Sequence, residues 1–144
     1  MYFRLFPGKN YELRIMESTK ITIQSFKDLH AWQEGHKLVL AIYKITQKFP
    51  KEEQFGLTNQ LRRAGVSITS NIAEGFSRNS YKEKVQFYSM SLGSLTEVQN
   101  QLLIAKDIHY ITEEEYILLF EITITVSKLL NGLIKKSKTI IHNS

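Results

Sequence analysis

Apolar side chains recur every three or four residues along most of this chain, a spacing that places them on one side of an α-helix. The clearest example is the stretch from Gly56 to Gly75, in which Leu57, Leu61, Ala64, Ile68 and Ile72 follow the pattern. We predict a helix over these residues whose leucine and isoleucine side faces a hydrophobic core. We expect it to end at Gly75, because glycine suits a helix C-terminus.

The same helix carries two further stripes that a simple core helix would not need. A polar stripe consists of Arg63, Ser67, Ser70 and Glu74. A strip of small side chains, Val66, Thr69 and Ala73, lies beside Arg62 and almost opposite the leucine side. A helix with two apolar sides usually has two neighbours. We therefore predict that Val66, Thr69 and Ala73 contact another subunit.

Three further helices are predicted from the same periodicity and from their start and stop signals. The first runs over residues 28–49 and is stopped by Pro50. The other two begin with reciprocal capping pairs, Ser80 with Glu83 and Thr112 with Glu115. Because only short links separate successive helices, they should be antiparallel neighbours. The predicted fold is all-α, an antiparallel up-down-up-down four-helix bundle.

Several motifs occur in a fixed order along the chain. They are Phe26-Lys27-Asp28-Leu29 with Trp32, Phe49-Pro50, Arg62-Arg63, Ser70-Asn71-Ile72-Ala73-Glu74-Gly75, Leu92-Gly93-Ser94-Leu95 with Glu97, and Leu130-Asn131-Gly132-Leu133-Ile134. Together they resemble the signature of the small bacterial four helix bundle protein family, first associated with intervening sequences of 23S ribosomal RNA. The accessory variability protein of diversity-generating retroelements belongs to the same group. The resemblance covers residues 25–138, with Gly65 and Thr69 as atypical positions.

Length and composition fit one compact domain. The chain has 144 residues, no cysteine and a formal net charge of +5, which permits nucleic-acid contact without requiring it. The apolar runs are shorter than the roughly 18 residues that a membrane span needs and the N-terminus lacks the long apolar core of a secretory signal, so we expect a cytoplasmic protein that contacts no membrane. We divide the chain into an N-terminal arm (1–24), the bundle (25–138) and a C-terminal tail (139–144). Residues 1–15 are either a genuine part of the arm or lie upstream of a true start at Met16.

No pattern in the sequence indicates an active site, a metal site or a cofactor. Glu-x-x-His pairs and glycine-rich phosphate loops are both absent from the sequence. Glu74 and Glu97 could act as paired carboxylates in acid-base catalysis. We favour a structural role for them, in which Arg63 forms a bridge to Glu74 or Glu97 and fixes the register between helices or subunits.

The candidate nucleic-acid contacts are basic residues around the link between the second and third helices. We select Arg62, Arg78 and Lys82 and interpret Lys84 as a solvated charge. The lysines at 135, 136 and 138 are interpreted as complements to the helix dipole.

The family resemblance implies a homo-oligomer, and its retroelement member suggests a pentamer that binds nucleic acid and a reverse transcriptase. We predict a non-enzymatic accessory or scaffolding protein that recognises backbone charge and shape. The alternative is a protein-interaction scaffold that binds no nucleic acid, for example a partner of a reverse transcriptase. An enzyme that uses Glu74 or Glu97 is the third possibility.

Overall fold

The computed structural model describes residues 22–144. Most of the predicted N-terminal arm and the alternative start at Met16 lie outside these residues. Within the described range the chain forms four long helices: α2 (His30–Thr46), α3 (Leu57–Ser77), α4 (Tyr81–Asp107) and α5 (Glu113–His142). Two short 3-10 helices, η2 (Phe26–Asp28) and η3 (Lys51–Glu53), precede α2 and α3. α5 therefore continues into the segment that the sequence assigned to a C-terminal tail.

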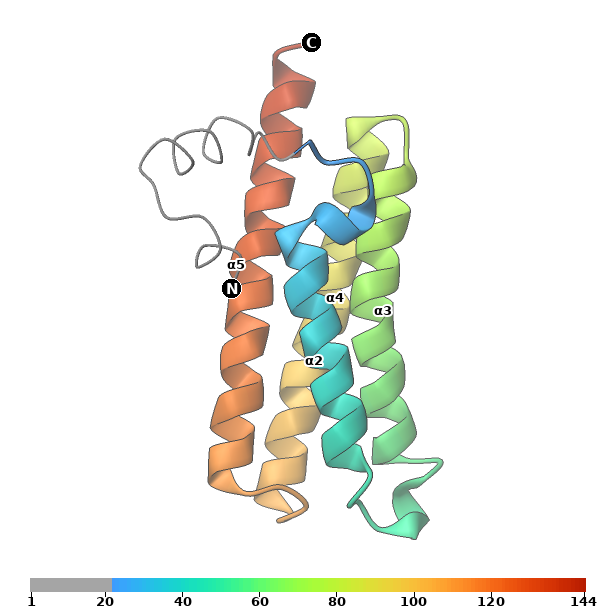
Figure 1. Ribbon diagram of the computed structural model, residues 1–144, viewed down its shortest axis with the longest axis vertical. Coiled ribbons are helices and arrows are strands. Elements are labelled where there is room, and N and C mark those ends of the chain that lie inside the picture. The colour runs from blue at the N-terminus through green and yellow to red at the C-terminus, as the bar shows by residue number, and fades with distance from the viewer. Residues whose placement is uncertain (1–21) are drawn as a thin grey trace, which may run out of the picture.

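The four helices form a bundle in which each helix contacts two others. α2 packs on α3, α3 on α4, α4 on α5 and α5 on α2, without comparable diagonal contacts among the described residues. Consecutive helices run in alternating directions along a common axis (Figure 1). The predicted all-α four-helix bundle is confirmed.

The core is built from the periodic apolar positions of all four helices. Its completely buried side chains include Leu38, Ile42, Leu61, Ile68, Ile72, Val98, Leu102, Val126 and Leu130. On α3 the leucine and isoleucine side faces this core as predicted, although Leu57 is only half-buried. The bundle therefore buries the stripe that the sequence pattern identified.

α2 approaches α3 closely at two glycines. A methyl group added at Gly65 would lie 3.0 Å from Cδ1 of Ile42, and one added at Gly35 would lie 3.2 Å from Cγ2 of Thr69. A glycine inside a helix costs about 1 kcal/mol relative to alanine, and this close packing accounts for its presence at position 65. Part of the small-residue strip, at Thr69, thus already has a neighbour within the chain.

The end of α3 differs from the prediction. The helix continues past Gly75 to Ser77, and Gly75 is buried where α4 crosses closely. Lys84 on α4 closes the helix end, because its Nζ donates to the carbonyl oxygens of Phe76 at 2.6 Å and Gly75 at 3.3 Å. Partial burial lowers the pKa of the Lys84 amine. The interpretation of Lys84 as a merely solvated charge was therefore wrong.

Of the two predicted reciprocal capping pairs, one forms completely in the structure and the other only in part. At the start of α5, Thr112 and Glu115 form the complete reciprocal pair. At the start of α4, Ser80 Oγ accepts from the backbone N–H of Glu83, but it also donates to the Glu83 carboxylate. The Glu83 side chain thus binds the hydroxyl of Ser80 and not its backbone N–H, and only half of that predicted pair forms.

Glu115 also links α5 to the segment after α2, because Lys48, two residues beyond the end of α2, donates to its carboxylate. The hydrogen bond from Lys48 and that from the Thr112 backbone lower the pKa of the Glu115 carboxyl below its ordinary value of 4.5. A lowered pKa means that the folded state binds the proton less well than the unfolded chain. The resulting stabilisation is present above pH 4.5 and is lost as the pH falls through the lowered pKa.

We expect Glu115→Gln to lower the free energy of unfolding by about 0.5 kcal/mol near neutral pH, because the capping acceptor remains and only the partly exposed ion pair is lost. The difference from the wild type should disappear in acid. Urea unfolding near neutral pH and in acid measures both values. Glu114→Gln is the control, since Glu114 is exposed and has no side-chain partner among the described residues. Equal effects of the two substitutions at both pH values would contradict the prediction.

α5 is long and apolar enough to pass for a membrane-spanning helix by length and composition, which inspection of the sequence did not anticipate. One window has a mean hydropathy of 1.7, yet only 28% of it is buried inside the bundle. The buried part, which includes Leu119 and Val126, packs in the common core. Ile117, Leu118 and Ile124 lie on the outside of the bundle.

Candidate nucleic-acid interface

The adjacent arginines on α3 have different surroundings. Arg62 is half-buried against α2, where its Nε donates to Thr46 Oγ1 at 2.8 Å and its guanidinium lies 4.7 Å from the centre of the Tyr43 ring. Arg63 is exposed and has no hydrogen-bond or ion-pair partner within residues 22–144. The sequence assigned the ligand contact to Arg62 and the structural bridge to Arg63. The structure favours the opposite assignment.

Arg78 and Glu74 form the ion pair at the end of α3. Arg78 Nη2 donates to Glu74 Oε2 at 3.0 Å, and the Arg78 guanidinium lies 4.5 Å from the centre of the Phe87 ring. Glu74 is thus paired with its neighbour one turn away. Arg63 is eleven residues before Glu74 on the same straight helix, about 16 Å along its axis, which is too far for a bridge. The predicted bridge between them is therefore not formed within the chain.

Lys82 is exposed on the first turn of α4, and its amine has no partner among the described residues. The last turns of α5 reach the same end of the bundle as the α3–α4 link (Figure 1). We define the basic end by Arg78, Lys82, Lys135, Lys136 and Lys138. The last three lysines of α5 belong to it because the antiparallel arrangement places them at the same end of the bundle as the link, although 50 or more residues separate them from it in sequence.

The opposite end of the bundle carries a cluster of six carboxylates. They are Glu52, Glu53, Asp107, Glu113, Glu114 and Glu115, interspersed with Lys48, Lys51 and Lys106. Charge is therefore distributed unevenly along the bundle axis. The phosphate backbone of a polyanion would be attracted more strongly to the basic end than to the end that carries these carboxylates.

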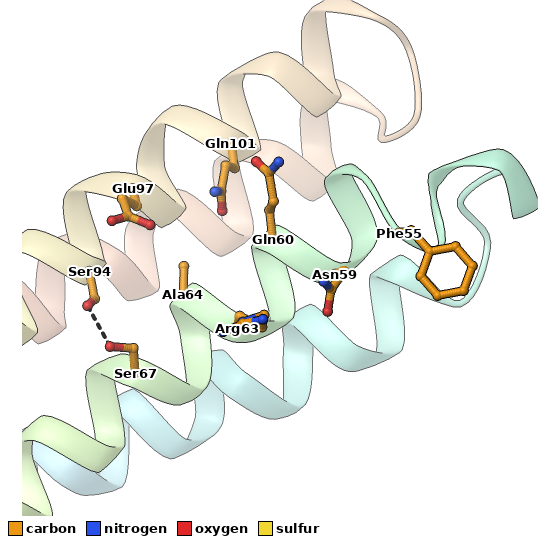
Figure 2. A pocket seen from close by; sticks show the side chains of 9 residues that line it. All are labelled: Phe55, Asn59, Gln60, Arg63, Ala64, Ser67, Ser94, Glu97 and Gln101. Carbon is orange, nitrogen blue, oxygen red and sulfur yellow. Dashed lines mark hydrogen bonds between the residues drawn. The ribbon is translucent and has the colours of Figure 1, made fainter.

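A polar hollow of 530 Å³ lies between α3 and α4 (Figure 2). It is lined by Phe55, Asn59, Gln60, Arg63, Ala64, Ser67, Ser94, Glu97 and Gln101. The hydroxyls of Ser67 and Ser94 form a hydrogen bond of 2.8 Å at one end of it (Figure 2). Glu97, like Arg63, is exposed and has no partner within the described part of the chain. The sequence selected Arg63 and Glu97 but had no signal for the hollow, which forms only where the two helices face each other.

Glu74 and Glu97 do not form a carboxylate pair. Ser67 and Ser94 mark positions at the same level on the antiparallel helices. Glu74 is seven residues from this level toward one end and Glu97 three residues toward the other, so about 15 Å separates them along the axis. Within residues 22–144, no group of three His, Cys, Asp or Glu side chains could hold a metal ion. The third hypothesis therefore lacks its two-carboxylate geometry.

The side chains predicted to contact another subunit are only partly exposed to solvent. Val66 is 39% exposed, whereas Thr69 and Ala73 are half-buried. Larger apolar side chains lie outside the bundle elsewhere, notably Leu118 at 64%, Ile117 at 48% and Ile124 at 40% exposure on α5. The contact through Val66, Thr69 and Ala73 stays a prediction, and α5 presents a more apolar surface.

Comparison with known proteins identifies the family. The model of the 23S rRNA-intervening sequence protein family matches residues 27–132. Among solved structures, a protein of unknown function from the S23 ribosomal protein family of Bacteroides thetaiotaomicron has the same fold, with a TM-score of 0.67 and 23% identity over 73% of this chain and 95% of that chain. No curated protein matches. Because the family model spans nearly the whole bundle, this chain belongs to the 23S rRNA-intervening sequence protein family.

Proposed function

We propose that this protein is a non-enzymatic homo-oligomer that binds nucleic acid through the basic end of its bundle. The observation that carries the proposal is the uneven distribution of charge along the bundle axis. Lys82, Lys135, Lys136 and Lys138 are exposed without partners in the described structure. Their ammonium groups are free to contact phosphates, which supply most of the sequence-independent affinity of such complexes.

The exposed apolar surface of α5 supports the oligomer. Ile117, Leu118 and Ile124 lie within two turns of α5 and are each at least 40% exposed, and large exposed apolar patches often mark a contact with another molecule. In a cyclic oligomer with parallel bundle axes, every basic end lies on the same rim. A nucleic acid could then contact several basic ends at once, and their weak individual affinities would combine into strong binding. The pentamer suggested by the family resemblance would be such an arrangement.

The test compares two variants of equal net charge. Lys82→Gln with Lys135→Gln removes two charges from the basic end, and Lys44→Gln with Lys51→Gln removes two from the other end. Binding of single-stranded RNA is measured by fluorescence anisotropy over a range of salt concentrations. If both removed lysines contact phosphates, the slope of log K against log salt should fall by about 1.4 in the first variant and stay unchanged in the second.

Two outcomes would contradict the proposal. Equal losses in the two variants would mean that the basic end is not the contact surface. Absence of binding at low salt would favour the alternative, a scaffold that contacts only proteins, such as a reverse transcriptase, through the apolar surface of α5. Solution mass provides a separate test of the oligomer, since a monomer would remove the basis for the addition of weak sites.

A further inference from the structure

We propose that the hollow between α3 and α4 binds one unpaired base of a single-stranded nucleic acid, with guanine as the best-fitting base. The inference rests on the proposed function and adds a base-reading site to it. This hollow is distinct from the basic end, since it extends from the Ser67–Ser94 contact to Phe55, on the turn that follows Glu53 at the opposite end of the bundle. Its volume of 530 Å³ falls within the range of about 300–1,000 Å³ that small-molecule sites occupy.

The buried amide of Gln101 offers a hydrogen-bond acceptor to a ligand in the hollow. Gln101 is only 7% exposed and lines the hollow. Its Oε1 atom is buried without a hydrogen-bond partner in the described structure. Native proteins rarely leave such an acceptor unsatisfied. An N–H donor placed in the hollow would satisfy it, and Gln60 on the facing helix lies beside it in the same hollow (Figure 2).

The two unpaired charges of the hollow select a ligand that both donates and accepts hydrogen bonds. Glu97 offers carboxylate oxygens, which only accept, and Arg63 offers a planar guanidinium, which only donates. A phosphate alone would meet repulsion from Glu97, and an apolar side chain would satisfy neither group. A nucleobase carries donors and acceptors on the edges of one planar ring, which matches this mixture.

Guanine fits the two groups better than the other bases. Its O6 and N7 atoms accept the bidentate pair of hydrogen bonds that arginine most often makes with a base. Its N1–H and N2–H₂ groups are neighbouring donors on one edge, which a carboxylate can accept together. Arg63 and Glu97 would thus contact different edges of the same ring. Gln101 Oε1 and the hydroxyls of Ser67 and Ser94 would remain for the other polar atoms.

Phe55 supplies an aromatic platform at the edge of the hollow. It sits on the turn before α3 and is 87% exposed, more than any other large apolar residue of the described chain. A phenyl ring that is so exposed to water contributes almost no hydrophobic stabilisation to the fold. Unpaired bases are commonly bound by stacking on aromatic side chains while their edges form hydrogen bonds. The position of Phe55 beside a polar hollow provides both kinds of contact.

The experiment uses short oligouridines that carry one central G, A or C, and it compares the full-length wild type with Glu97→Gln. The wild type should bind the G-containing oligomer at least about fivefold more tightly than the others. Glu97→Gln should remove this preference, so that the G-containing oligomer and the other oligomers bind with similar affinities. Glu121→Gln is the matched control, because it removes an exposed carboxylate on α5 that lies outside the hollow. Phe55→Ala should weaken the binding of every oligomer, whichever base it carries at its centre, by about fivefold or more, because any base can stack on the ring.

The outcomes separate this proposal from the proposed function. If every oligomer binds equally well to the wild type, the base site is wrong and binding at the basic end still stands. If no oligomer binds at low salt, both proposals fail. If Glu97→Gln alters the solution mass but not the base preference, the hollow is a contact between subunits, as the predicted Arg63 to Glu97 bridge would require, and the base site is overturned. Circular dichroism of each variant verifies that the bundle is folded.

Discussion

Gly75→Ala should lower the free energy of unfolding by up to about 2 kcal/mol, although alanine is ordinarily the better helix residue by about 1 kcal/mol. A methyl group on Gly75 would lie 2.7 Å from Cε1 and 2.9 Å from Cδ1 of Tyr88. Tyr88 is 3% exposed and cannot move aside without disturbing the core. Overpacking of this kind costs about 1–3 kcal/mol, which outweighs the gain in helix propensity. Urea unfolding followed by circular dichroism measures the change.

Gly93→Ala is the matched control and should have the opposite sign. Gly93 is exposed in the middle of α4, and an added methyl group would meet nothing within 4 Å. Only the helix propensity then changes, so we expect a gain of about 0.5–1 kcal/mol. A stabilising effect of both substitutions would show that α3 and α4 are not in close contact at Gly75.

Leu102→Ala should lower the free energy of unfolding by about 2–5 kcal/mol, the largest effect that we expect from a single substitution in this chain. Leu102 is completely buried between the helices. Its truncation removes the transfer free energy of the lost atoms and leaves a cavity that the surrounding helices can fill only in part. Because a domain of this kind has a total stability of only about 5–15 kcal/mol, the variant should unfold at a clearly lower urea concentration.

Leu40→Ala provides the comparison at the surface. Leu40 has the same side chain on α2, but it is 57% exposed. The expected change is within about 0.5 kcal/mol. Similar losses for Leu102 and Leu40 would mean that the assignment of core and surface is wrong. The measurement is the same urea titration, with the slope of the transition compared to exclude a change in the unfolded state.

The surroundings of the two arginines show where sequence reasoning was insufficient. Adjacent helical positions point about 100° apart, so it followed from the sequence that Arg62 and Arg63 could not share one role. Which of them is structural depends on the hydroxyl of Thr46, which comes from another helix and accepts from Arg62. No local pattern encodes that contact. The same holds for Gly75, which suits a helix end by its residue type but is needed for the approach of Tyr88.

The sequence by itself determined the helices, most of their starts and the side of α3 that enters the core. These features follow from local spacing, from caps within four residues and from glycine or proline, whose effects are confined to their own segment. The ordered motifs also determined the family. Only the tertiary structure decided which charges remain unpaired, that the lysines of α5 join the α3–α4 link, and that Arg63 and Glu97 share a hollow with Gln101. Those relations join residues far apart in sequence, and they depend on the direction and rotation of packed helices, which local periodicity does not specify.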